Sequence, residues 1–137
     1  MSKRQDNWQG MNWIRPTTRL AIYLRDGLAC VWCGDTLENA ARLELDHLLP
    51  HSKGGDNKPI NLVTTCNRCN ASRGARTMAS FAQAVAEYVD GEQTAASILN
   101  HISNCRRRKL PRAEARTIMQ RRSSVRAAVQ ELTPTIS

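Results

Sequence analysis

Alternating apolar and polar residues over residues 43–46 predict a short strand, and an apolar, β-branched run over residues 62–65 predicts a second one. Between them, residues 50–59 contain two prolines, a Gly-Gly pair and an Asp-Asn pair, which are typical of a loop. Asn70 and the residues that follow it predict the start of a helix that breaks near Gly74. The centre of the chain is therefore expected to run strand, loop, strand, helix.

Helical patterns flank this centre on both sides. Before it, Thr17 or Thr18 can cap a short helix that ends at Asp26-Gly27. After it, apolar residues recur at helical spacing in three stretches. These stretches are residues 78–89, ending before Gly91, residues 95–105, and residues 111–132, ending before Pro134. The third starts with Pro111 at a first-turn position, where proline favours a helix.

The cysteines of the chain suggest a metal site. Four of the five form two Cys-x-x-Cys pairs, Cys30 with Cys33 and Cys66 with Cys69, and two such pairs supply the four thiolates that tetrahedral zinc prefers. With only one Phe, two Tyr and three Trp in 137 residues, the core buries little area and an added staple would stabilise it. The alternative is four buried, reduced cysteines. Cys105 continues an apolar helix face and is expected in the core.

No signal peptide or membrane-spanning stretch is visible in the sequence, which favours an intracellular protein with reduced thiols over one with disulfides. Of the formal net charge of +8, most lies in residues 105–137. A basic tail beside a metal site indicates a polyanionic partner, most simply nucleic acid. The alternative is a solubilising amphipathic helix. The basic residues of the tail are Arg106, Arg107, Arg108, Lys109, Arg112, Arg116, Arg121, Arg122 and Arg126.

His47, Asp46 and Asn70 carry the groups that phosphodiester hydrolysis needs. Histidine is the natural base at neutral pH, and carboxylate and amide oxygens suit a hard cation such as Mg²⁺. Because adjacent strand residues point to opposite faces, Asp46 and His47 require a break in the strand to serve one site. The Leu-Leu-Pro turn that follows His47 can provide this break.

Several motifs occur together in this region. They are Cys-x-x-Cys, then Leu-Glu-Leu-Asp-His-x-x-Pro-x-Ser-x-Gly-Gly, then Asn-Leu-Val-Thr-x-Cys-x-x-Cys-Asn, with Arg25-Asp26 before the first cysteine pair. With these motifs, the segment from Cys30 to Gly74 resembles an HNH endonuclease of the ββα-metal group, in the subfamily with two zinc-binding cysteine pairs. The resemblance covers about a third of the chain and does not extend to residues 76–137.

The resemblance implies a role for each matching residue. His47 would be the general base that deprotonates the attacking water, and Asp46 and Asn70 would hold one catalytic Mg²⁺ or Mn²⁺. Asn61 would brace the loop and orient His47, while the four cysteines would hold a structural zinc. The products would carry 5′-phosphate and 3′-hydroxyl ends. Asn70 stands where the family name calls for histidine, and its amide oxygen favours Mg²⁺ or Mn²⁺ over Ni²⁺ or Zn²⁺.

Basic and polar side chains of the loop, the metal-site helix and the tail are candidates for DNA contact. They are His51, Lys53, Arg68, Arg73, Arg76, Arg106, Arg107, Arg108 and Lys109. Such contacts would position the DNA backbone without reading its sequence. The alternative is a solvated surface, with His51 as an ordinary loop histidine.

Together these features predict a small α+β, zinc-stapled ββα-metal domain with flanking helices and a basic helical extension. The expected units are an arm over residues 1–15, the nuclease domain over residues 16–76 and the extension over residues 77–137. We expect a metal-dependent endonuclease or nickase whose partner is double-stranded DNA; cutting both strands would require a homodimer or two encounters. The alternatives are a non-catalytic zinc module that binds DNA and an accessory nuclease active only within a larger phage or restriction assembly.

Overall fold

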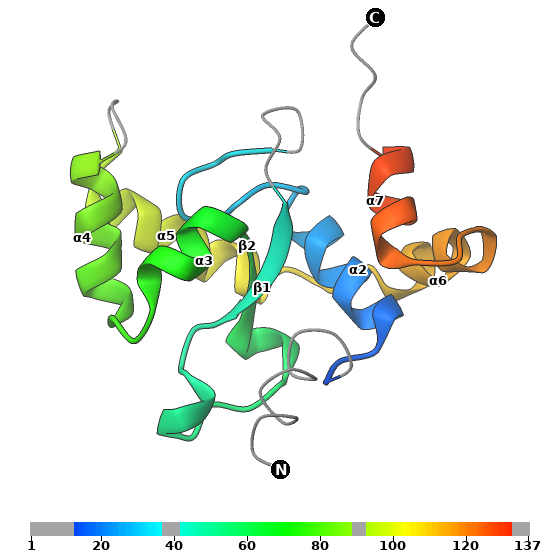
Figure 1. Cartoon of the computed structure of the whole chain (residues 1–137), viewed down its shortest axis with the longest axis horizontal. Coiled ribbons are helices and arrows are strands. Elements are labelled where there is room, and N and C mark those ends of the chain that lie inside the picture. Colours follow the sequence, from blue (N-terminus) through cyan, green and yellow to red (C-terminus); the bar gives the residue numbers. More distant parts are fainter. Residues whose placement is uncertain (1–12, 37–41, 89–92, 133–137) are drawn as a thin grey trace, which may run out of the picture.

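A two-stranded antiparallel sheet lies at the centre of the computed structural model, which describes residues 13–36, 42–88 and 93–132 (Figure 1). Strand β1 (Leu43–His47) pairs with β2 (Leu62–Cys66), so that Leu43 lies opposite Cys66 and His47 lies opposite Leu62. Both strands were predicted from the sequence, and each is one residue longer than the pattern indicated. Short 3₁₀ turns, η2 (His51–Lys53) and η3 (Pro59–Asn61), shape the loop between the strands.

Helices lie on both sides of this hairpin. Figure 1 shows α3, α4 and α5 on one side and α2, α6 and α7 on the other. Their bounds are α2 (Pro16–Arg25), α3 (Asn67–Arg73), α4 (Met78–Tyr88), α5 (Ala95–Arg107), α6 (Arg112–Arg121) and α7 (Val125–Leu132). The small α+β architecture predicted from the sequence is confirmed. None of the helices in the described part of the chain is long and apolar enough to cross a membrane.

The hairpin separates two hydrophobic cores, called here the first core and the second core. The first core contains Cys30, Val31, Trp32, Leu48, Val63, Cys66, Phe81, Ala82, Val85, Ile98, Ile102 and Cys105. The second core contains Ile14, Leu20, Ala21, Ile22, Tyr23, Leu45, Leu62, Ala115, Ile118, Ala128 and Val129. Leu62 packs into the second core and the next residue, Val63, into the first, because successive strand residues point to opposite faces. The hairpin is thus a wall that both cores share.

The first described helix begins differently from the prediction. Its N-cap residue is Arg15, no side chain caps it, and Pro16 occupies its first turn. Proline at this position has the helical φ already and lacks an N–H that would need a partner. The expected cap at Thr17 or Thr18 was therefore wrong.

The basic tail contains two helices where one was predicted. Helix α6 ends at Arg121 and α7 begins at Val125, and the Ser124 hydroxyl accepts a hydrogen bond from the Ala127 N–H across the start of α7. Helical spacing continues through this break because both helices pack apolar residues into the second core. Pro111 is the N-cap residue of α6 rather than part of its first turn. The residues expected to end the neighbouring helices, Val89 with Gly91 and Pro134, lie outside the described residues, as does most of the arm.

Candidate metal centre and active site

The four cysteines of the two pairs come together at one end of the hairpin. Cys30 and Cys33 lie in a turn that the Gly34 N–H closes onto the Cys30 carbonyl, with Gly34 at a positive φ of 83° that favours glycine. Cys66 ends β2 and caps α3, and Cys69 lies in the first turn of that helix. The four Sγ atoms lie within 4.8 Å of one another.

This cluster has the dimensions of a zinc site. Zinc–thiolate bonds of about 2.3 Å in a tetrahedron place neighbouring sulfur atoms about 3.8 Å apart, and the Sγ atoms of Cys33 and Cys66 are 3.8 Å apart. Cys105 is buried in the first core, outside the cluster, as predicted. The four clustered cysteines can therefore hold a structural zinc ion.

Hydrogen bonds among the four cysteines shift the pKa values of neighbouring thiols in opposite directions. Hydrogen bonds from Cys33 and Cys69 hold the pKa of Cys30 far below its usual range. The same contacts to Cys30 raise the pKa of Cys33 to about 12 and that of Cys69 further still. One thiolate therefore forms at the expense of its neighbours. A divalent cation would favour the thiolate form of all four.

Asp46 is a buried carboxylate near the end of β1. Its Oδ2 accepts hydrogen bonds from Arg73 Nη1 at 2.7 Å and from Trp32 Nε1 at 3.3 Å. Burial raises the pKa of Asp46, and the Arg73 guanidinium opposes that rise. In the described part of the chain both contacts go to Oδ2, so Oδ1 is the carboxylate oxygen that remains for a cation.

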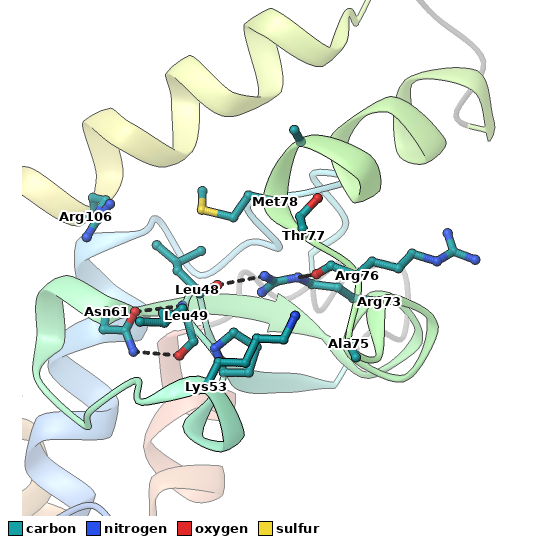
Figure 2. Close-up of a pocket in the computed structure, with 12 residues that line it drawn as sticks. Leu48, Leu49, Lys53, Asn61, Arg73, Ala75, Arg76, Thr77, Met78 and Arg106 are labelled. Atoms are coloured by element: carbon teal, nitrogen blue, oxygen red, sulfur yellow. Dashed lines mark hydrogen bonds between the residues drawn. The ribbon is translucent and has the colours of Figure 1, made fainter.

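Arg73 occupies a different place from the DNA contact expected of it. Only 2% of the residue is exposed. Its guanidinium donates to the carbonyls of Leu48 at 2.7 Å and Arg76 at 3.1 Å (Figure 2), and also to the His47 carbonyl at 3.0 Å and to Asp46. It also lies over the Trp32 ring, 5.4 Å from the ring centre. Arg73 thus holds the end of β1 in place through four hydrogen bonds within the protein.

His47 lies on the strand face opposite Asp46. Its ring centre is 4.8 Å from that of Trp13, and its Nε2 is 2.8 Å from Asn57 Oδ1. Because β1 extends through His47, the strand does not break between Asp46 and His47. The chain turns only after His47, where the Leu48 N–H donates to the Asn61 carbonyl.

The Asn61 side chain hydrogen-bonds to the loop backbone and not to His47, among the described residues. Its Oδ1 accepts from the Leu49 N–H at 2.9 Å, and its Nδ2 donates to the carbonyls of Leu49 and Asp56. Gly55 lies so close that a Cβ there would be 1.7 Å from the Leu49 carbonyl oxygen, which only glycine avoids. The side chain that contacts His47 is Asn57, which sequence reasoning missed because its only signal was a turn-forming Asp-Asn pair.

Asn70 projects from α3 towards β1, where its Nδ2 donates to Glu44 Oε1 at 2.8 Å. Glu44 and Asp46 are two residues apart and so share the strand face that α3 covers. Glu44 is a second group that the sequence analysis did not single out, although its place in the Leu-Glu-Leu-Asp alternation puts it on that face. Oxygen donors from Asp46, Asn70 and Glu44 therefore lie on one side of the hairpin.

The remaining DNA-contact candidates divide into two groups. His51, Lys53, Arg76, Arg107 and Lys109 are exposed. The others make contacts within the protein, although Arg68 and Arg108 are exposed as well. Arg68 pairs with Asp35, Arg106 donates to the Ile60 carbonyl at 2.8 Å, and Arg108 donates to the Arg25 carbonyl at 3.2 Å. Part of the expected basic surface thus ties α3 and α5 to neighbouring segments.

Comparisons with known proteins find nucleases with similar sequences. The sequence model of the HNH endonuclease family matches residues 30–85. A CRISPR-associated endonuclease Cas9 from Actinomyces naeslundii is 40% identical over 66 residues, which are 47% of this chain and 6% of that protein. The Cas9 endonuclease from Corynebacterium diphtheriae is 35% identical over 60 residues, 43% of this chain and 5% of that protein.

A solved structure is also similar. The crystal structure of the Type II-C Cas9 enzyme from Actinomyces naeslundii aligns with 80% of this chain and 15% of that one, at 25% identity and a TM-score of 0.43. The chain therefore spans a small part of the length of the relatives that it matches.

Proposed function

Residues 30–85 belong to the HNH endonuclease family, and on that premise we propose that this chain hydrolyses phosphodiester bonds of DNA with a divalent cation. The observation that carries the proposal is the end of β1. There Asp46 is held by Arg73 while His47 is held by Asn57, on the two faces of one strand end. A substrate phosphate placed at this end would meet a base and a group of oxygen donors together.

His47 is the proposed general base. When Asn57 Oδ1 accepts the Nε2–H of His47, the ring keeps its free lone pair on Nδ1. Nδ1 then takes the proton from the attacking water. The Trp13 ring, tilted by 34° against the imidazole at a centre-to-centre distance of 4.8 Å, limits the rotation of the imidazole and so preserves this orientation.

Asp46 and Asn70 are the proposed ligands of the catalytic Mg²⁺ or Mn²⁺, and their oxygens are the donors that such hard cations prefer. When bound, the ion would stabilise charge on the phosphate and on the leaving 3′ oxygen. Arg73 keeps the Asp46 carboxylate oriented through Oδ2, and Glu44 orients the Asn70 amide by accepting from Nδ2. The Asn70 Oδ1 is thereby turned away from that bond and is available as a ligand. The products would carry 5′-phosphate and 3′-hydroxyl ends.

The proposed substrate is double-stranded DNA, cut one strand at a time, because the chain carries a single candidate base. Cutting of both strands would then require a dimer or two encounters. Asn61 contributes indirectly, since its three hydrogen bonds fix the loop that carries Asn57.

A plasmid assay tests this proposal. The zinc-loaded protein is incubated with supercoiled plasmid without added cation, with Mg²⁺ and with Mn²⁺, beside His47→Ala and the matched control His51→Ala, which removes an exposed histidine of the same loop. We expect nicked product that requires the cation, is lost in His47→Ala and persists in His51→Ala. Equal product from both variants, or product without a cation, would contradict the assignment of the base.

A second candidate is an accessory nuclease that acts only within a larger assembly. The observation favouring it is that the matched stretch makes up 6% and 5% of the Cas9 relatives. This version predicts an intact plasmid in the assay above and cutting once a co-purifying partner is added. A non-catalytic zinc module that binds DNA predicts a gel shift without cutting under both conditions.

A further inference from the structure

A pocket of about 420 Å³ opens beside the candidate site, on the side of the hairpin that carries α3 and α4. Figure 2 shows Leu48, Leu49 and Lys53 on one side of it and Thr77 and Met78, at the start of α4, on the other. Leu48 directly follows His47, and the Arg73 guanidinium that binds Asp46 forms part of the wall. The pocket therefore lies on the Asp46 side of the hairpin, at the end of β1.

The lining of this pocket combines an apolar surface with positive charge. Leu49, which is 48% exposed, and Met78 supply aliphatic and thioether surface, whereas Leu48 is only 4% exposed and belongs to the first core. Four cationic side chains line the pocket, those of Lys53, Arg73, Arg76 and Arg106, and no acidic residue is among the lining residues. The lining thus suits a ligand that has both a flat apolar part and an anionic group.

The polar groups differ in how far they are already engaged. The Asn61 side chain forms hydrogen bonds with the loop backbone. The Arg73 guanidinium forms hydrogen bonds with Asp46 and with the carbonyls of three residues, His47, Leu48 and Arg76. Arg106 donates Nε to the Ile60 carbonyl. Lys53 and Arg76 project from exposed positions. An anionic group in the pocket would therefore be bound mainly by Lys53 and Arg76.

We propose that this pocket binds one nucleotide of the strand whose phosphate lies at the candidate site, its phosphate on Lys53 and Arg76 and its base against Leu49 and Met78. The inference rests on the proposed function for the identity of the ligand. Charge complementarity favours a nucleic-acid strand, and the position beside the Arg73–Asp46 pair lets a strand reach both the pocket and the end of β1. Aliphatic contact with a base face carries no sequence readout, so the pocket positions the strand without selecting a base.

The first test fills the pocket without changing charge. Ala79→Trp places a large side chain at an exposed lining position, and Ser80→Trp places the same side chain one residue further, outside the lining. Binding of a fluorescein-labelled oligothymidylate is measured by anisotropy with full-length, zinc-loaded protein, no added divalent cation and one fixed salt concentration. We expect about tenfold weaker binding for Ala79→Trp, because the indole fills the pocket and the contacts of one base are lost, and unchanged binding for Ser80→Trp. Equal affinity of the two variants overturns the proposal.

The second test removes charge from the pocket. Lys53→Ala with Arg76→Ala is compared with Arg116→Ala with Arg126→Ala, which removes the same charge from exposed positions on α6 and α7. The pocket pair should weaken oligonucleotide binding more than the tail pair and should raise KM for plasmid nicking while leaving kcat unchanged. Equal losses of oligonucleotide binding in the two double variants would contradict the proposed pocket. A change in poly-glutamate binding for Lys53→Ala with Arg76→Ala, with oligonucleotide binding unchanged, would contradict it as well.

These binding experiments separate the two proposals. A wild type that binds the oligonucleotide through the pocket yet never cuts plasmid contradicts the nuclease proposal and leaves the nucleotide pocket supported. If instead the wild type cuts plasmid, and Ala79→Trp equals Ser80→Trp in both oligonucleotide binding and KM, the nuclease proposal is supported and the nucleotide pocket is contradicted.

Discussion

Two buried arginines hold the loop between the strands, one from each side of the hairpin. Arg73 in the first core binds the carbonyls at the start of the loop, and Arg25 beside the second core donates to the carbonyls of Pro59 and Leu62 at its end. Each is paired with a carboxylate, Arg73 with Asp46 and Arg25 with Asp26. The same device thus fixes both ends of one loop.

The two pairs differ in what the carboxylate can still do. Both side chains of the Arg25–Asp26 pair are at most 1% exposed, and Asp26 Oδ2 also accepts the Thr64 N–H at 2.8 Å. In the other pair, Arg73 is 2% exposed but Asp46 is 11% exposed. Asp26 therefore has a structural role only, whereas the Asp46 side chain is still accessible to solvent. A buried ion pair becomes a candidate functional group when one oxygen of its carboxylate stays accessible.

Loss of zinc should have the largest effect and tests whether the cores are independent. Structural zinc contributes about 10–16 kcal/mol in small zinc-binding peptides, which matches or exceeds the total stability of a typical domain. Since the hairpin supplies Val63 to the first core and Leu62 to the second, we expect chelation to unfold both. Circular dichroism and amide exchange measure this. Protected amides in α2 and α6 after chelation would show that the second core stands alone; Cys105→Ser, outside the cluster, should keep its zinc.

Removing either arginine should have the next largest effect and distinguishes the two pairs directly. Arg25→Met and Arg73→Met each leave a buried carboxylate unpaired, which costs about 3–5 kcal/mol of unfolding free energy. Urea denaturation should show similar losses for both. Plasmid nicking below the unfolding transition should fall sharply only for Arg73→Met, because only its carboxylate faces the proposed cation. Similar activity in the two variants would remove the functional distinction between the pairs.

A matched truncation in each core should have a smaller effect than loss of zinc and compares their packing. Ile102 in the first core and Ile118 in the second are 0% and 5% exposed, and an isoleucine-to-alanine change at such sites costs about 2–5 kcal/mol. Both variants should therefore lose stability in urea. Ile118→Ala, which lies outside residues 30–85, should keep its KM and kcat for plasmid nicking. A fall in kcat for Ile118→Ala would link the second core to the chemistry.

The same contrast explains what the sequence could predict. Alternation and helical periodicity located the hairpin and the helices that pack on it, because burial on one face dictates those patterns. Cysteine spacing located the thiolate cluster for a similar reason, since metal geometry fixes the spacing of its ligands. The break between α6 and α7 was not predicted because the apolar spacing continues through it. Ser124 caps the start of α7 in the structure, but a single serine does not predict a break.

Side-chain partners were harder to predict than elements. Arg73 was expected at the surface because arginine is rarely buried, and nothing in its local sequence shows four acceptors converging on it. Asn57 reaches His47 only through the path of a loop that Asn61 and Gly55 shape. These contacts depend on distant segments, which a pattern along the chain does not record. The catalytic roles of His47, Asp46, Asn61 and Asn70 remain proposals that the plasmid assay tests.

The smallest expected effect comes from a surface ion pair of the second-core helices. Glu131 on α7 pairs with Arg121 and Arg122, and these contacts hold the pKa of Glu131 below its usual range. A lowered folded-state pKa contributes stability above the ordinary glutamate pKa, and that contribution is lost as the pH falls through the folded-state value. Glu131→Gln should therefore lower Tm slightly at neutral pH and match the wild type in strong acid. Because the pair is solvent-screened, a large difference at neutral pH, or one that persists in acid, would mean that Glu131 supports the packing of α6 on α7 rather than a simple ion pair.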